Sequence, residues 1–376
     1  MNRTVLAWTA FVAVTAAWFG YIAAAVIREG DYQWHLAAAT DLTRGIVRVP
    51  HLLFHVGVAA LTLLGVTPDA AGVTATVVFQ VAAAVSTAWF VRAVAPDTAL
   101  RAVLLLALAV MLAGPILPPG TDRDLAMVGY FLPNAIHNPT VIAAKPFVPV
   151  LLSLAAVASG LAAAPRWSVA SGALATVFAG LAKPHYVSCI VPAAALVAAV
   201  RAAGRRAVRS RLLVLGLGAP AIVTLAATYA AVRAMPGNAA VSIAPLAVLR
   251  LFAPVDAASI LQRTASDIAF PATVLVLWPS VVRRFPWLLL AWLAYVLALS
   301  QAYLFAETGP RVADGNFLWG PQLATFGLLT AHAAVLPRIR DADAGAAPWR
   351  VMLAAMILLL HAVYGVWFVI GRVAGG

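Results

Sequence analysis

Charged side chains are scarce in this sequence: Asp, Glu, Lys and Arg make up 10% of its 376 residues, against about 25% in a soluble domain. Hydrophobic residues account for 64%, against roughly 45–50%. A soluble fold cannot hide that much apolar surface, and a disordered chain needs low hydrophobicity and high charge. The strands of a transmembrane barrel alternate apolar and polar residues, whereas this chain has unbroken apolar runs. The composition therefore predicts an all-α protein, a polytopic transmembrane helical bundle.

Cysteine is nearly absent as well. Cys189 is the only one in the sequence, so it cannot form an internal disulfide. The chain also lacks a Cys/His zinc pattern and a long basic, aromatic-interleaved stretch of the kind that binds nucleic acid. Acidic residues are outnumbered 13 to 25 by basic ones, which gives a net charge of +12. The arginines gather in a few loops, which is typical of the positive-inside bias and of contact with anionic lipid. We expect the lipid bilayer as a partner and no nucleic acid, while the sequence does not identify a protein partner.

The chain contains many long apolar runs. A span needs about 20 predominantly apolar residues, and Val5–Ile27 meets this length. Its apolar core exceeds the roughly 7–15 residues of a cleaved signal peptide, so we expect it to remain as a signal anchor. Further candidates are His51–Val66, Val73–Val94, Ala102–Leu117, Val141–Ala163, Val169–Ala182, Val187–Val200, Leu212–Val232, Ile268–Val282, Trp287–Phe305, Leu318–Leu336 and Val351–Ile370. These segments predict about ten to thirteen spans in one integral membrane domain over residues 1–376.

Arginine-rich loops predict the orientation of these spans. The positive-inside rule puts such loops in the cytoplasm. Three of them carry Arg201, Arg205, Arg206, Arg209 and Arg211, then Arg283 and Arg284, then Arg338, Arg340 and Arg350. Counting spans outward from them puts the polar loops 306–317, 233–267, 183–186 and 118–140 on the external face.

The first polar loop, 28–50, conflicts with this count. Three apolar segments separate it from loop 118–140, which places the two loops on opposite faces if each segment crosses. Arg3 ahead of the first span nevertheless favours an external first loop. Because His51–Val66 is short and begins with a histidine, we predict that it is a re-entrant or incompletely crossing helix.

Titratable residues around the first loop are the leading candidates for chemistry. Residues 33–44 are expected to form a short interfacial helix, and helical spacing puts Asp31 near His35, and His51 near His55. A carboxylate just outside the first span can act as a general base on an acceptor hydroxyl, so Asp31 is the catalytic candidate. The same four residues are of metal-ligand type, although their spacing matches no specific motif. A divalent metal is therefore an open alternative, beside a loop whose charges simply mark the membrane boundary.

A second polar stretch precedes the segment that starts at Val141, and it contains Asn134, His137 and Asn138. Asn138, which is followed by a proline, is expected to cap a helix start. The N–H groups of that start, together with Lys145 one turn deeper, suit a phosphate group. The alternative is a capped helix with a lysine that snorkels to the interface.

Two more polar turns are predicted on the external face. Lys183 and His185 flank a proline between two apolar runs, and Lys183 is suited to neutralise the phosphate of a lipid-linked substrate. In the late loop, Arg311 can hold a phosphate in bidentate fashion, while Asn316 and Trp319 suit sugar recognition through hydrogen bonds and ring stacking. The alternative for both turns is ordinary external turn structure.

These residues and their order resemble the multi-spanning glycosyltransferases of the C fold (GT-C). The resemblance rests on Asp31 in the loop after the first span, on the run Pro50-His51-Leu52-Leu53-Phe54-His55, and on His137-Asn138-Pro139-Thr140 followed by Lys145. It implies a polyprenyl-phosphate-linked sugar as donor and an acceptor-activating role for Asp31. Glu29-Gly30-Asp31 stands where better-known branches of the family have an adjacent Asp-Glu pair, and we expect no large external C-terminal domain.

The leading hypothesis is a membrane glycosyltransferase of the cell envelope, in the bacterial cytoplasmic membrane, that moves a sugar to an acceptor at the external face. Lys145, Lys183 and Arg311 would stabilise the leaving lipid phosphate. The first alternative is a transporter or flippase of a lipid-linked glycan that uses the same cationic residues without chemistry. The second is a membrane-embedded acyl- or phosphotransferase that uses one of the histidines.

The predicted orientation can be tested by cysteine labelling in a Cys189→Ala background. A cysteine introduced at Arg205 should be protected from an impermeant thiol reagent in intact cells, because the positive-inside rule places its loop in the cytoplasm. A cysteine at Gly309, in loop 306–317, should react. Labelling of position 205 from outside would refute the orientation.

Overall fold

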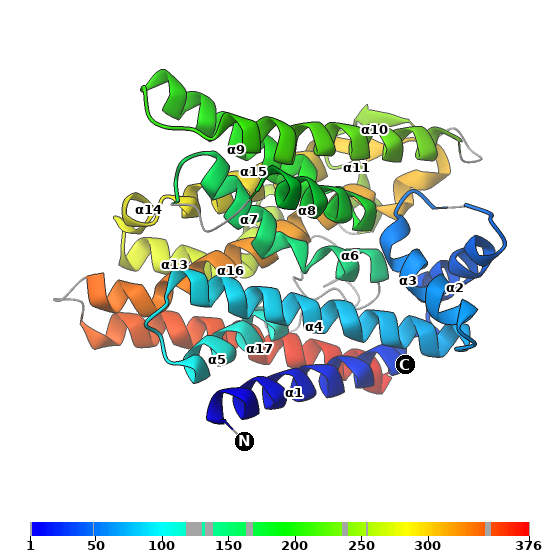
Figure 1. Cartoon of the computed structure of the whole chain (residues 1–376), viewed down its shortest axis with the longest axis horizontal. Coiled ribbons are helices and arrows are strands. Elements are labelled where there is room, and N and C mark those ends of the chain that lie inside the picture. Colours follow the sequence, from blue (N-terminus) through cyan, green and yellow to red (C-terminus); the bar gives the residue numbers. More distant parts are fainter. Residues whose placement is uncertain are drawn as a thin grey trace.

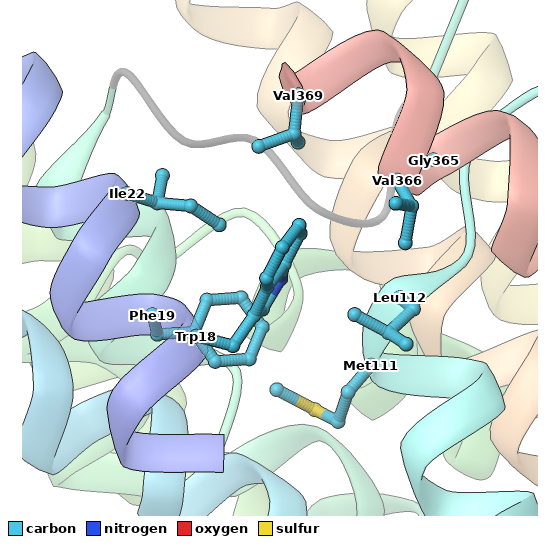
Figure 2. Close-up of a pocket in the computed structure, with 8 residues that line it drawn as sticks. All are labelled: Trp18, Phe19, Ile22, Met111, Leu112, Gly365, Val366 and Val369. Carbon is cyan, nitrogen blue, oxygen red and sulfur yellow. The ribbon is translucent and has the colours of Figure 1, made fainter. Parts of the chain in front are cut away.

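The computed structural model describes residues 2–47, 49–117, 130–131, 138–162, 168–234, 240–252, 255–342 and 347–375. Helices make up most of these residues. The described strands, β1 (Val241–Ile243) and β2 (Phe305–Glu307), form one antiparallel pair in which Val241 faces Glu307. Most of the helices run side by side along the long axis of the molecule (Figure 1).

Five helical segments in the described part of the chain are long and apolar enough to cross a membrane. They are α1 (Arg3–Val26), α4 (Pro68–Val94), the π-helical η2 (Leu212–Gly218) with α10 (Ala219–Ala234), α15 (Trp287–Leu304) and α17 (Pro348–Gly375). The pair α12 (Ala257–Asp267) and α13 (Ala269–Leu277) also qualifies but is bent by 76°. Shorter apolar helices are α3 (Leu52–Leu63), α5 (Leu100–Leu112), α7 (Phe147–Ala158), α8 (Val169–Ala182) and α9 (Val187–Ala203). These helices confirm the predicted all-α integral membrane protein.

The central helix of the bundle is α16 (Trp319–Ala342), which is buried on every side from residue 319 to residue 336. It packs against α4, α5, α7, α13 and α15. Although it is 24 residues long, it is not among the helices apolar enough to cross a membrane alone, since it carries Gln322, Thr325, Thr330 and His332. His332 accepts a hydrogen bond at Nε2 from the indole N–H of Trp292 on α15, 3.2 Å away. Polar side chains on this helix therefore face protein.

The two ends of the bundle differ in character. α2 (Gly30–Thr43) and α3 lie at one end, to the right in Figure 1. Tyr32 of α2 hydrogen-bonds Thr76 near the start of α4 (3.2 Å), and Leu36 packs against Gly72. α4 therefore begins where α1 ends, and α3 between them does not run from one end of the bundle to the other. At the opposite end Arg338 donates a hydrogen bond to the carbonyl of Val94, the last residue of α4 (3.1 Å).

The described parts of the loops predicted to share one face meet at the end that holds α2 and α3, which we call the polar end. β1 from loop 233–267 pairs with β2, and Asn316 of the late loop bonds Lys183. The 3₁₀ helices η3 (Gly309–Asp314) and η4 (Asn316–Leu318) and the short helix α11 (Ala247–Phe252) pack beside these strands. α14 (Val281–Arg284), which carries two of the clustered arginines, lies at the other end (Figure 1).

Two predicted segments are interrupted. The segment expected over 141–163 divides into α6 (Pro139–Ala144) and α7, because Pro146 cannot donate a backbone hydrogen bond. The segment expected over 102–117 leaves the helical conformation after Leu112, since the proline after Gly114 disfavours a helix there.

His361 of α17 anchors the non-helical segment that follows α5. Its Nδ1 lies 2.6 Å from the carbonyl of Gly114 and must donate, while its Nε2 accepts from the N–H of Phe270 on α13, 3.2 Å away. The ring is therefore neutral with the proton on Nδ1, and it joins α17, α13 and the chain after α5. One turn further along, a Cβ on Gly365 would lie 1.9 Å from the carbonyl oxygen of Leu112, so only glycine allows this approach.

Gly365→Ala should therefore lower the thermal unfolding midpoint in detergent by several degrees, because overpacking typically costs about 1–3 kcal/mol. Gly57→Ala is the matched control: it lies in the interior of α3 with open space around its Cβ position, where alanine stabilises a helix by roughly 0.5–1 kcal/mol. Equal midpoints for Gly365→Ala and the wild type would contradict this packing.

Candidate functional site

Asp31 lies in the first turn of α2, just beyond the end of α1. A carboxylate is favoured there because the first turn of a helix carries unpaired N–H groups and the positive end of the helix dipole. The next turn of the same helix brings His35 onto the same face. The helix predicted over residues 33–44 is thus present as α2, which starts at Gly30 and carries the catalytic candidate in its first turn.

Asn138 joins Asp31 to the start of α6. Its side-chain oxygen accepts hydrogen bonds from the N–H of Val141 (3.2 Å) and the hydroxyl of Thr140 (2.7 Å), which confirms the predicted helix cap. With the oxygen engaged, the amide N–H₂ is left to donate to the carboxylate of Asp31. The cap therefore positions the carboxylate as well as the helix.

Lys183 provides the positive charge nearest to this carboxylate among its described partners. It follows the last residue of α8, only 3% of it is exposed, and its charge interacts with that of Asp31. Its Nζ donates to the side-chain oxygen of Asn316 at 3.4 Å and lies 5.7 Å from the centre of the Trp319 ring. The amide of Asn316 in turn donates to Glu307 at 2.7 Å. Four elements of the polar end therefore meet at one ammonium group.

Opposing influences act on the carboxyl group of Asp31. The side chain reaches the molecular surface, yet partial desolvation by the surrounding chain is the dominant influence and raises its pKa above the ordinary 3.8. Lys183 and the hydrogen bond from Asn138 act against this increase, while the charge of Asp314 adds to it. A raised pKa improves a carboxylate as a general base at neutral pH, because the optimum lies near the working pH.

Four histidines lie beside Lys183. The Nδ1 of His35 is 2.8 Å from the Nε2 of His55, and the Nδ1 of His55 is 2.6 Å from the carbonyl oxygen of His51. The ring of His51 lies 6.3 Å from that of His185, measured between centres. The structure thus brings together Asp31, His35, His51, His55, Asn138, Lys183, His185 and Asn316, which are eight of the predicted site residues.

The backbone carbonyl oxygen of His51 fixes the direction of the hydrogen bonds within this cluster. A carbonyl oxygen only accepts, so the Nδ1 of His55 carries a proton and its Nε2 accepts from the Nδ1–H of His35. Burial, then His55, then the charge of Lys183 lower the pKa of His35 well below its ordinary value. His35 is therefore neutral and its Nε2 is left as an acceptor.

The other predicted site residues fall into two groups. Lys145 is fully buried at the junction of α6 and α7, about two helical turns after Asn138. Asn134, His137 and the side chain of Arg311 lie outside the part of the chain that the structure describes. Their roles, and that of Lys145, stay predictions.

Two acidic residues of the late loop complete the site, although the sequence singled out its arginine and asparagine. Glu307 and Asp314 flank Asn316 and act on the same group of charges. Within the described ranges no three His, Cys, Asp or Glu residues are arranged to hold a metal ion. The described charges at the site are thus three carboxylates around one ammonium.

No family model, no curated protein and no solved structure matches this chain. The geometry of the polar end is therefore the basis for assigning a function.

The tautomers inferred for the histidine pair can be measured by ¹⁵N NMR of histidine-labelled protein in detergent. Both His35 and His55 should carry the proton on Nδ1 rather than Nε2. Substitution of His51 by Gln should leave the pattern unchanged, because residue 51 contributes only its backbone carbonyl. An Nε2-protonated ring at either position would contradict the inferred direction.

Proposed function

We propose that this protein is a membrane glycosyltransferase that transfers a sugar from a polyprenyl-phosphate donor to an acceptor at the external face of the membrane. The observation that carries the proposal is that the buried ammonium of Lys183 interacts electrostatically with the carboxylate of Asp31 at the polar end. Transfer of a sugar from a phosphate needs a base for the acceptor hydroxyl and a positive charge for the leaving group. The two residues supply one each.

The proposed reaction is a single displacement at the anomeric carbon. The acceptor oxygen bonds to that carbon while its proton passes to the carboxylate of Asp31. The bond between the anomeric carbon and the phosphate oxygen breaks, and its electron pair leaves with the lipid phosphate. The ammonium group of Lys183 stabilises the negative charge that develops there.

The surroundings of Lys183 suit a phosphate that arrives from the bilayer. Its ammonium donates to an amide oxygen at 3.4 Å and lies over the face of Trp319. Neutral rings of His51 and His185 stand nearby and supply N–H donors. Lys145 and Arg311 are assigned to the same lipid phosphate by the sequence pattern alone.

The all-α bundle with its long apolar helices supports an enzyme embedded in the membrane. We infer a C-fold (GT-C-like) bundle of ten to thirteen spans in the bacterial cytoplasmic membrane, with the arginine-rich loops inside. α2 would lie in the interface, where Trp34, which is 54% exposed, anchors it among the lipid head groups. A long polyprenyl chain would remain in the bilayer while its phosphate meets Lys183.

A transporter or flippase of a lipid-linked glycan is the second candidate. The observation that favours it is the 76° bend between α12 and α13, because broken helices with a buried carboxylate line the substrate or ion site in many transporters. The two candidates differ in whether Asp31 is needed for turnover.

Replacement of Asp31 by Asn should reduce sugar transfer by about 10²–10⁴-fold, which is the usual contribution of a general base. Binding of the polyprenyl-phosphate donor should survive, since asparagine preserves size and most hydrogen bonding. Transfer from a lipid-linked sugar in liposomes, beside donor binding, measures both. Asp41→Asn, in the last turn of the same helix, is the matched control and should keep wild-type turnover. Wild-type turnover in Asp31→Asn would move the transporter ahead.

The pH dependence of transfer should report the environment of Asp31, because a general base works only when it is deprotonated. Since desolvation raises the pKa of Asp31, we expect the acid limb of the rate profile above the pH at which an exposed aspartate titrates. Lys183→Met removes a charge that lowers this pKa, so the limb should move to higher pH. Lys183→Arg keeps the charge and should leave the limb in place. A limb that moves to lower pH in Lys183→Met would refute the pairing.

A further inference from the structure

The bend between α12 and α13 is a fixed feature of the fold, because separate segments hold both of its sides. The carbonyl of Ser266, in the last turn of α12, accepts a hydrogen bond from the N–H of Ile116 (3.4 Å). The N–H of Phe270, in the first turn of α13, is bound by His361 (3.2 Å). The chain therefore turns at Asp267 and Ile268 in one defined way.

Asp267 is buried at this turn with half of its carboxylate unused. Only 2% of the residue is exposed, and its Oδ2 accepts from the N–H of Phe131 at 2.9 Å. Its Oδ1 has no hydrogen-bond partner in the described part of the chain. The hydroxyl of Tyr295 on α15, which interacts electrostatically with Asp267, is also buried and without a described partner. Two polar atoms of one cluster thus lack a partner among the described residues, and a buried polar atom left without any partner costs about 1–3 kcal/mol.

Electrostatics indicates what kind of ligand is missing. The charge of Arg263, one turn earlier on α12, acts favourably on the Asp267 carboxylate. The start of α13 adds the positive end of a helix dipole. The unmet need of Oδ1 is a hydrogen-bond partner that can donate to an ionised carboxyl or accept from a protonated one. A neutral hydroxyl group meets that need and can also bond the hydroxyl of Tyr295.

We propose that Asp267 and Tyr295 bind hydroxyl groups of the acceptor, and that the acceptor is therefore a carbohydrate. The inference rests on the proposed glycosyl transfer and adds the chemical class of the acceptor. Aromatic rings surround the carboxylate as they do in many sugar sites: Phe131 and Tyr303 lie 6.3 Å apart between ring centres, and Tyr303 is also within 3.4 Å of the Thr264 hydroxyl.

The chain itself places this second carboxylate in reach of the first. Asp267 binds the backbone of Phe131, and Asp31 binds the side chain of Asn138, seven residues later. Because an extended chain spans at most about 3.3–3.6 Å per residue, the two attachment points are no more than roughly 25 Å apart. An oligosaccharide of that length could contact both carboxylates.

The test uses the full-length protein in detergent with two measurements. The first is the shift of the unfolding midpoint caused by a panel of methyl glycosides: gluco-, manno- and galactopyranoside and arabinofuranoside. At about ten times its Kd, a bound glycoside should raise the wild-type midpoint by roughly 2–4 °C. The second is the KM for a saccharide acceptor in the transfer assay.

Asp267→Asn and Tyr295→Phe should lose the glycoside shift and raise the acceptor KM at least tenfold, while the donor KM stays unchanged. Tyr295→Phe keeps the ring and guards against misfolding of the aspartate variant. Asp256→Asn is the matched control, because Asp256 caps the other end of α12 and is exposed to solvent, so it should behave like the wild type.

The outcomes separate this inference from the proposed function. Asp31→Asn should abolish transfer and keep the glycoside shift. If transfer occurs but Asp267→Asn and Tyr295→Phe leave both the shift and the acceptor KM unchanged, the turn holds only buried water, and the inference fails while the transferase stands. If a glycoside shift depends on Asp267 but no transfer occurs, the sugar site stands and the transferase fails.

Discussion

The buried ammonium group of Lys183 is the constraint on which the polar end depends. A charge removed from water must be compensated by hydrogen bonds and opposite charges. Here the compensation comes from different parts of the chain: Asp31 after the first long helix, and Asn316 with Glu307 before the central one. Without this ammonium the neighbouring carboxylates, Asp314 included, would repel one another. The same requirement that assembles the loops therefore produces the pair of charges that a glycosyl transfer needs.

Local sequence rules predicted the parts of the structure that depend on neighbouring residues. The helix after the first span, and the cap that Asn138 provides to α6, follow from short-range spacing and from the preferences of asparagine and proline. The closeness of His51 and His55 follows from a single helical turn. The apolar runs likewise predicted most of the long helices, since hydrophobic length is a property of one segment.

Contacts between distant segments could not be predicted from the sequence. Nothing local marks His361 as the residue that joins α17 to α13 and to the chain after α5. In the sequence, Asp267 is the last polar residue of a predicted external loop. In the structure it is buried and accepts a hydrogen bond from the backbone N–H of Phe131, 136 residues away. The segment after Asn138 was expected to be continuous because its composition is apolar, although Pro146 divides it. Long-range hydrogen bonds leave no periodic signal in the sequence.

The burial of α16 on all sides has a consequence for how the protein is made. A helix that carries Gln322, Thr325, Thr330 and His332 enters lipid poorly by itself, because polar side chains in the bilayer are costly. The helices that contact it most, α4, α5, α7, α13 and α15, precede it in the chain, while α17 follows it. When the ribosome reaches α16, the partners of its polar groups, such as Trp292 for His332, are already in the membrane. The order of synthesis thus matches an order of assembly in which the central helix enters a site prepared by its predecessors.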